Sequence, residues 1–287
     1  QTLAAFSAAQ GPILLNLSCG FEELPLTHPD YPIAGLRNPE MARAYLTALT
    51  LADRIIVSSQ SLSEILMPAY PKVELIPDFW SKENELWFKS PPVRSTVNLG
   101  WINTGGNLED LASVRRVIVR VMRQFPETRL VVAGDMKAYQ LFDNIPESNK
   151  IFLPSVENED LPYLLSQIDI LLVPMRNTAF NRSSSDTLLM NSGVKRIPWI
   201  ASPIPAFLDW NSGGLIATSI DEWHVFLSQL INDRDLRKSL GDQGYQKAGT
   251  REAGNVVISW LNLIKQIASV GENNDRGRDL GLEGGLK

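Results

Sequence analysis

Residues 97–133 read VNLGWINTGGNLEDLASVRRVIVRVMRQFPETRLVVA. The run 97–101 is a short apolar strand, 103–107 is a glycine-containing turn, and 108–125 has the periodicity of an amphipathic helix. Five apolar residues recur on one face of that helix: Leu111, Val114, Ile118, Val121 and Phe125. A second apolar run, 129–133, follows. This order of strand, helix and strand predicts a βαβ unit in a parallel sheet.

The same alternation extends in both directions. Further strands are predicted downstream at 151–153, 168–173, 197–201 and 215–217, and upstream at 13–17, 54–58 and 72–76. Helices are predicted at 40–51, 59–69, 221–231, 235–247 and 252–268. The sequence therefore predicts an α/β protein with two Rossmann-like doubly wound domains.

The chain divides into four parts on this interpretation. Residues 1–92 form a partial N-terminal domain that ends in a charged, proline-ended linker. Residues 93–250 form the C-terminal domain, and 251–270 form a C-terminal helix. Residues 271–287 are rich in glycine and charge and lack an apolar stripe, so we expect a disordered tail.

Composition excludes several classes of site. The 287 residues include one cysteine, Cys19, which allows no internal disulfide and no cysteine-based metal site. Two histidines, His28 and His224, argue against a His-rich metal centre. A net charge of −5 argues against nucleic-acid binding, although a local basic pocket for phosphate is allowed. No export signal or apolar run of about 20 residues is found, which favours a cytoplasmic location. The missing initiating Met indicates that the chain was cut from something longer.

Ligands of doubly wound sheets bind beyond the carboxyl ends of the strands, so the loops 103–107, 134–136 and 174–186 are the candidates. In the first loop, Gly105 and Gly106 let a ligand approach the backbone next to a helix N-terminus. Gly134 ends the next strand in a similar way. In both loops a plain tight turn is the alternative interpretation.

The loop 174–186 carries two arginines, Arg176 and Arg182, and three consecutive serines. Ser184 or Ser185 is expected to cap the following helix, whose free N–H groups and Arg182 would attract an anion. The alternative is a polar surface loop.

Other patterns favour structural roles. The Asp-Arg-Asp run at 233–235 is more typical of a helix cap than of a metal site. Arg115, Arg116 and Arg120 are interpreted as a solvated helix face. His224 lies within an amphipathic helix and is assigned to packing or surface. His28 is the only histidine that is a candidate general base.

From about Leu51 to Gly244 the chain resembles the GT-B glycosyltransferases, specifically the retaining group called family 4. The resemblance is carried by ADRIIVSS at 52–59, KVELIPD at 72–78, LGWI at 99–102, NLEDL at 107–111, FNRSSSD at 180–186, Pro198 and Ala201-Ser202. THPDY at 27–31 also has a counterpart in a subset of that group. The resemblance implies the GT-B architecture with an incomplete first domain, and a last helix that crosses back to it.

The resemblance also implies a function and site residues. It implies metal-independent transfer from a nucleotide-diphosphate sugar to a glycan or lipid-linked acceptor. The donor is a substrate, and no separate cofactor is expected. Asn191 would contact the ribose or sugar, and His28 is the acceptor-side candidate. The donor would be held by residues of three loops: Gly105, Gly106, Gly134, Asn181, Arg182, Ser183, Ser184, Ser185 and Asp186. Peripheral association with the inner face of a membrane is left open.

The chain departs from the family pattern at its acidic and basic positions. Two family glutamates eight positions apart align with Ser183 and Asn191, and a family lysine aligns with Ser184. The basic pair expected after the strand at 97–101 is absent. Arg182 is the best remaining cation, with Arg176 and Lys195 nearby in sequence. Two alternatives therefore stay open: a degenerate binding or scaffold module without turnover, and a GT-B epimerase.

Overall fold

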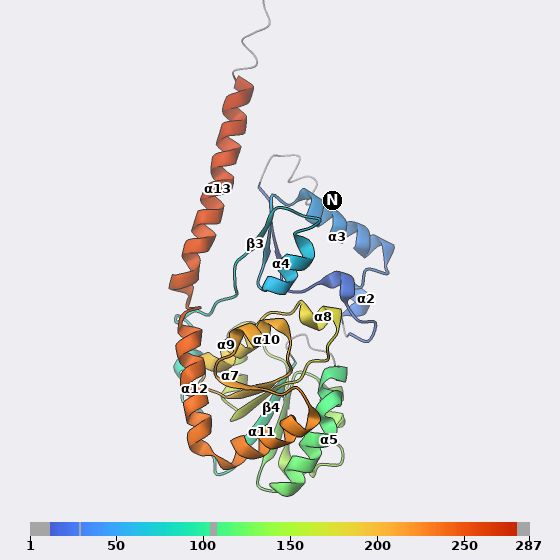
Figure 1. Ribbon diagram of the computed structural model, residues 1–287, viewed down its shortest axis with the longest axis vertical. Coiled ribbons are helices and arrows are strands. Elements are labelled where there is room, and N and C mark those ends of the chain that lie inside the picture. Colours follow the sequence, from blue (N-terminus) through green and yellow to red (C-terminus); the bar gives the residue numbers. More distant parts are fainter. Residues whose placement is uncertain (1–11, 29, 104–107, 280–287) are drawn as a thin grey trace, which may run out of the picture.

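The computed structural model describes residues 12–28, 30–103 and 108–279. These residues form two parallel sheets, which lie in different parts of the molecule (Figure 1). The three-stranded sheet has the order β1 (Leu14–Leu17), β2 (Arg54–Val57) and β3 (Val73–Leu75). The six-stranded sheet has the order β6-β5-β4-β7-β8-β9. Among the described helices, none is long and apolar enough to span a bilayer.

The first sheet is covered by short helices. Its core contains Ile55 and Val57 of β2 packed with Leu62 and Leu66 of α4. A 3-10 turn in the stretch interpreted as a linker, η2, buries Trp87 against Trp80. The helical elements of this part are η1 (Phe21–Glu23), α2 (Tyr31–Ala34), α3 (Pro39–Leu51), α4 (Gln60–Leu66) and η2 (Glu85–Phe88).

All six strands of the second sheet are parallel to their neighbours. Their bounds are β4 (Asn98–Ile102), β5 (Arg129–Ala133), β6 (Lys150–Leu153), β7 (Ile170–Val173), β8 (Trp199–Ala201) and β9 (Gly214–Ile216). Each predicted strand is present, but β7 and β8 each begin two residues later than expected. Ile168 still donates its backbone N–H to Leu165 O, so it belongs to the preceding turn.

The helices of the second domain pack on both faces of this sheet. The predicted apolar stripe of α5 is confirmed, because Leu111, Val114, Ile118 and Val121 are all buried against one face. The elements are α5 (Leu108–Gln124), α6 (Met136–Gln140), η3 (Glu147–Asn149), η4 (Asn158–Asp160), α7 (Leu161–Leu165), α8 (Ala179–Arg182), α9 (Thr187–Val194), α10 (Pro205–Trp210), α11 (Ile220–Asn232) and α12 (Arg234–Gly249).

The last helix, α13 (Ala253–Asp279), leaves the second domain and runs along the first (Figure 1). Its Val256 and Leu263 pack on Ile56 and Ile76 of the first domain, as the resemblance implied. The helix assignment includes residues 271–279, and the disordered tail expected for 271–287 stays a prediction. Once a helix is nucleated, each added residue gains a hydrogen bond, so a helix can outlast its apolar stripe. Residues 280–287 lie outside the described part.

The contact between α9 and α12 depends on small residues. A Cβ built on Gly193 would lie 2.6 Å from Gly244 O and 3.3 Å from Ala248 Cβ. The two backbones therefore approach more closely than any side chain at Gly193 would allow. This contact holds α9, and with it the end of the loop 174–186, against the body of the domain.

Gly193→Ala should therefore destabilise the protein by about 1–3 kcal/mol, the usual cost of overpacking a filled contact. Gly249→Ala is the matched control, since a Cβ there meets nothing within 4 Å. It should be neutral or stabilising by up to about 1 kcal/mol, because alanine favours helix more than glycine does. Urea unfolding of both variants measures the difference. Equal stability would show that α9 and α12 are not in close contact.

Candidate functional site

The second sheet changes direction between β4 and β7. From β4 the chain proceeds to β5 and β6 on one side, then returns to β7 and continues to β8 and β9 on the other. β4 and β7 are therefore neighbours at the point where the strand order reverses, and ligands of such sheets bind beyond the carboxyl ends of the strands at this point. Asn103 follows β4 directly, and the predicted site loop 174–186 follows β7. Thr104 to Asn107, including Gly105 and Gly106, lie outside the described residues.

Gly134 lies at the neighbouring strand end, in a conformation that favours glycine. Its φ is +94°, and a Cβ would lie 3.1 Å from Asn103 Cβ. Asn103 in turn donates its backbone N–H to Ala133 O over 3.0 Å. The loops after β4 and β5 are thus in direct contact, and glycine is required at 134 for conformation and for space.

Asp110, in the first turn of α5, holds the start of the loop 174–186. Its carboxylate is 2% exposed and accepts the backbone N–H of Arg176 over 2.9 Å. It also accepts both Asn181 Nδ2 contacts, at 3.0 and 3.1 Å. Sequence reasoning missed Asp110, because an acidic residue in the first turn of a helix is an ordinary charge preference and indicates nothing about a distant partner.

Asn181 and Arg182 both lie in α8, whose N-cap Thr178 accepts the backbone N–H of Asn181. Their side chains differ in burial and in hydrogen-bond partners. Asn181 is buried and its amide nitrogen is committed to Asp110 and to Arg176 O. Arg182 is exposed and donates to Asn177 Oδ1 over 2.8 Å. Of these two predicted donor-site residues, Arg182 is the one that faces solvent.

Ser183 lies in the contact between the two domains. Its side chain is buried, and its Oγ accepts the backbone N–H of Gly20 over 2.8 Å. The Ser183 hydroxyl donates to Phe180 O, and Ser59 Oγ of the first domain donates to Ser183 O over 2.9 Å. Ser183, which aligns with a family glutamate, therefore forms hydrogen bonds that connect the two domains.

The start of α9 differs in detail from the prediction. Its N-cap is Asp186, so the expected cap at Ser184 or Ser185 is wrong. Ser185 Oγ instead lies 2.8 Å from Thr187 Oγ1, with which it shares a hydrogen bond. Within the described residues, the side chains of Ser184 and Asn191 make no hydrogen bond. Ser184 is partly exposed, and Asn191 is 8% exposed.

The carboxylate of Asp186 pairs with Arg251, in the segment that connects α12 to α13. Arg251, just before α13, donates to Asp186 Oδ2 over 2.9 Å and to Asp78 O over 3.2 Å. Burial raises the pKa of the Asp186 carboxyl, and the adjacent Arg251 opposes that shift. Arg251 also lies over the Trp210 ring. The pair thus joins the two domains and neutralises the carboxylate at the start of α9.

The other candidate cations are engaged by the protein itself. Arg176 pairs with Glu109 and Asp110. Lys195 donates to three carbonyl oxygens of residues 86–89, and burial lowers the pKa of its amine. Of the two arginines in the loop 174–186, Arg182 alone has no carboxylate partner among the described residues.

The remaining predicted positions have local partners. His28 is buried against Phe180 in a T-shaped contact, and its Nδ1 accepts the backbone N–H of Asp30 over 3.1 Å. Accepting that N–H places the ring proton on Nε2 when the ring is neutral. Asp233 caps α12 through the backbone N–H of Leu236, as predicted for the Asp-Arg-Asp run. Within residues 12–28, 30–103 and 108–279, no three His, Cys, Asp or Glu side chains gather where they could hold a metal.

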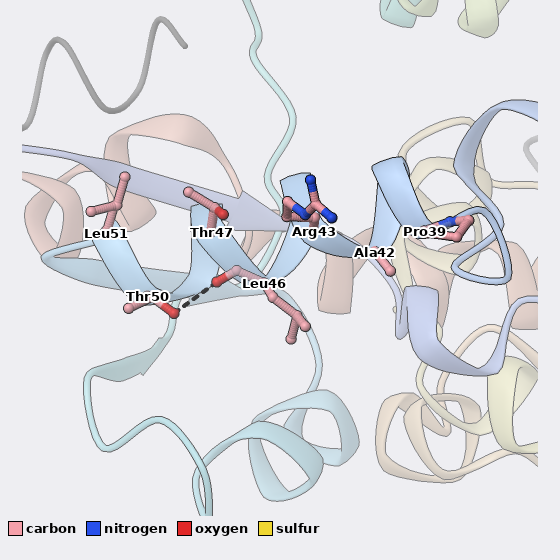
Figure 2. A pocket seen from close by; sticks show the side chains of 7 residues that line it. All are labelled: Pro39, Ala42, Arg43, Leu46, Thr47, Thr50 and Leu51. Carbon is pink, nitrogen blue, oxygen red and sulfur yellow. Dashed lines mark hydrogen bonds between the residues drawn. The ribbon is translucent and has the colours of Figure 1, made fainter.

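A surface hollow of about 560 Å³ lies in the first domain and includes none of the predicted site residues (Figure 2). All of its lining comes from α3: Pro39, Ala42, Arg43, Leu46, Thr47, Thr50 and Leu51. It is lined mainly by apolar and small polar groups, unlike the loops at the turning point of the second sheet.

The sequence matches no protein-family model and no curated protein. Solved structures do match. Sucrose-phosphate synthase from Thermosynechococcus elongatus aligns with a TM-score of 0.66 and 14% identity, over 93% of this chain and 71% of that one. Anabaena HepE in complex with UDP and glucose aligns with a TM-score of 0.65 and 14% identity, over 93% and 74%. A glycosyltransferase from Rickettsia africae gives 0.66 and 11%, over 93% and 73%. The protein has the GT-B fold.

In this GT-B fold, Ser183→Glu should destabilise the protein by at least about 2 kcal/mol, because it buries an unpaired charge and removes the acceptor of the Gly20 N–H. Ser184→Glu is the matched control at a partly exposed neighbour and should change stability by less than about 1 kcal/mol. Thermal and urea unfolding give both values. If the two variants are equally stable, position 183 opens to solvent and the interdomain bond is not formed.

Arg251→Met should destabilise the protein by an amount that grows with pH. Asp186 has a raised pKa, so its charged form is the unfavourable one in the folded state. The penalty is absent at a pH below the pKa of Asp186 in the unfolded chain. It grows as the pH rises, and it is complete above the raised pKa of Asp186 in the folded protein. Without Arg251 the penalty is larger, and the loss relative to wild type should reach about 3 kcal/mol at neutral pH, as for a broken buried pair.

Urea unfolding between about pH 4 and 8 tests this dependence, with the exposed Arg234→Met as a pH-insensitive control. A loss that is the same at every pH would mean that Arg251 acts through packing on Trp210 alone.

Proposed function

We propose that the chain binds a nucleotide-diphosphate sugar at the turning point of its second sheet and transfers the sugar to a glycan or lipid-linked acceptor. The observation that carries this proposal is a polar loop and helix start at the point between β4 and β7 where the strand order of a GT-B fold reverses. Structural similarity to sucrose-phosphate synthase, and to HepE bound to UDP and glucose, supports it.

In this proposal the diphosphate contacts Arg182, the hydroxyls of Ser184 and Ser185, and the N–H groups at the start of α9. Negative charge grows on the leaving diphosphate as the glycosidic bond breaks, and fixed donors stabilise that charge most. Asp186 would repel an anion at this helix start, but its pairing with Arg251 removes most of that repulsion. Transfer would then need no metal ion.

The remaining contacts complete the proposed donor site. Asn191 supplies a neutral amide for ribose or sugar hydroxyls, since it makes no side-chain hydrogen bond within the described residues. The Gly105 and Gly106 amides, predicted from sequence and outside the described residues, stay in the proposed donor set, and Gly134 contacts Asn103 at the start of their loop. Asp110 is a positioning residue, because it fixes Asn181 and Arg176 on either side of the loop.

The acceptor would lie against the first domain, near His28. We propose that His28, buried against Phe180 of the second domain, helps to form the acceptor side of the site. A lipid-linked acceptor would bring this face to a membrane surface.

A second candidate is a binding or scaffold module without turnover. It is favoured by Ser183, whose hydroxyl is bonded to Gly20, and by Asn191, which supplies no negative charge. Both positions align with glutamates of the family that the sequence resembles. The two candidates differ in whether the chain binds a nucleotide and in whether it transfers a sugar.

Arg182→Ala should weaken binding of the preferred nucleotide diphosphate by about 1.5–3 kcal/mol, the value of a hydrogen bond to a charged group. Calorimetric titration with UDP, GDP, ADP and TDP identifies the nucleotide and measures the loss. Arg234→Ala, an exposed arginine at the start of α12, is the control and should leave the affinity unchanged.

Unchanged affinity in Arg182→Ala would remove Arg182 from the site. Binding without transfer of sugar to any glycan or lipid acceptor would favour the scaffold module. No binding of any of the four nucleotides would contradict the proposed donor site.

A further inference from the structure

The solvent-facing side of α5 carries arginines without acidic neighbours on the helix. After Asp110 the helix contains no Asp or Glu, but it contains four arginines: Arg115, Arg116, Arg120 and Arg123. Positions 116, 120 and 123 follow the i, i+4, i+7 spacing of one helix face, and all three side chains are exposed. Like charges four apart destabilise a helix by about 0.2–0.5 kcal/mol per pair, so this arrangement has a cost.

The protein does not neutralise these charges itself. The ion pairs formed within the described ranges use other residues, and none includes any of the four arginines. Arg176 and Arg251, in contrast, are each paired with carboxylates. The net charge of the chain is −5, so these arginines form a local excess of positive charge on an acidic protein.

The arginines converge on a surface hollow of about 330 Å³, which we call the α5 arginine hollow. Its lining is Arg115, Arg116, Val119, Arg120, Arg123 and Asn144. Arg115 is anchored, because it donates to Leu141 O and, over 3.2 Å, to Asn144 Oδ1. That bond uses the acceptor of Asn144 and leaves its Nδ2 as a donor. The polar side chains of the hollow therefore offer donors and positive charge.

We propose that the α5 arginine hollow is a second binding site, for phosphoryl groups, separate from the candidate donor site. A cation would be repelled by the guanidinium groups, and a neutral sugar hydroxyl would accept hydrogen bonds from them without compensating their charge. A phosphoryl group carries a charge of about −1 as a diester and about −1.5 to −2 as a monoester, and it matches the bidentate geometry of guanidinium groups. The apolar stripe of α5 separates this face from the sheet, and Asp110 at the donor site lies in the first turn of the helix.

The spacing indicates more than one phosphoryl group. Seven residues separate Arg116 from Arg123, which is about 10 Å along a helix axis and too far for one phosphate to reach both ends. The shared chemistry is thus two or more adjacent phosphoryl groups. They could belong to a soluble oligophosphate or to neighbouring headgroups of an anionic phospholipid surface, and the experiment separates these sources.

The test uses the full chain with two probes: inorganic tripolyphosphate in calorimetry, and phosphatidylcholine vesicles with or without phosphatidylglycerol in sedimentation. The wild type should bind at least one probe, and Arg116→Ala/Arg120→Ala should weaken that binding at least tenfold. Both side chains are exposed, so the double variant should fold. Tripolyphosphate binding would identify a soluble ligand, and binding to phosphatidylglycerol vesicles alone would identify a lipid surface.

Two controls keep the proposal falsifiable. Arg37→Ala/Arg234→Ala removes the same charge from exposed arginines elsewhere and should retain binding. Arg182→Ala should also retain it, which separates this site from the donor site. Binding of neither probe, or an equal loss in the Arg37/Arg234 variant, would overturn the proposal.

Discussion

The pairing of β4 with β7 is the constraint on which the candidate site depends. These strands are distant in sequence, yet Leu99 is in register with Ile170 and Gly100 with Leu171. The register is fixed where it begins: Asp169 donates its backbone N–H to Asn98 O, and its Oδ2 accepts the backbone N–H of Asn98, both over 2.8 Å. Because the loops after both strands then start side by side, Asp110 can reach the loop 174–186. A slip of one residue would reverse which side chains face each layer of the core.

The same loop is restrained from the first domain. Ser183 and Asp186 lie on opposite sides of two partly exposed serines, Ser184 and Ser185. Ser183 is bonded to the distant Gly20, and Asp186 is bonded to the distant Arg251. Buried polar groups of this kind are stable only while every partner is present, so each bond restricts the separation of the domains. A ligand at Arg182 and Ser184 would therefore meet a loop whose two ends are already fixed. Such preorganisation lowers the entropy cost of binding.

The strands, and the stripe of α5, could be predicted because their signal is local: apolar residues at regular spacing within one element. The roles of Ser183 and Asp186 could not, because their partners are 163 and 65 residues away and the pattern of a loop does not identify a distant group. Asn181 shows the same limit. The resemblance assigned it to the diphosphate, whereas its amide is committed to Asp110, whose side chain had no distinguishing signal.

Net charge was a poor guide to where anions could bind, because the cations of this chain are not equivalent. Three of the basic side chains near the loop 174–186 are bound to partners within the protein: Arg176, Lys195 and Arg251. Arg182 is therefore the cation of this loop that we propose for an anionic ligand. An anion there would depend mainly on backbone N–H groups and hydroxyls, whose short-range hydrogen bonds are little affected by salt. The α5 arginine hollow presents solvated guanidinium groups instead, and such interactions are screened within about 8 Å at physiological ionic strength. Two sites on one chain that both accept phosphoryl groups should therefore respond differently to salt: the hollow should lose affinity steeply, and the candidate donor site only slightly.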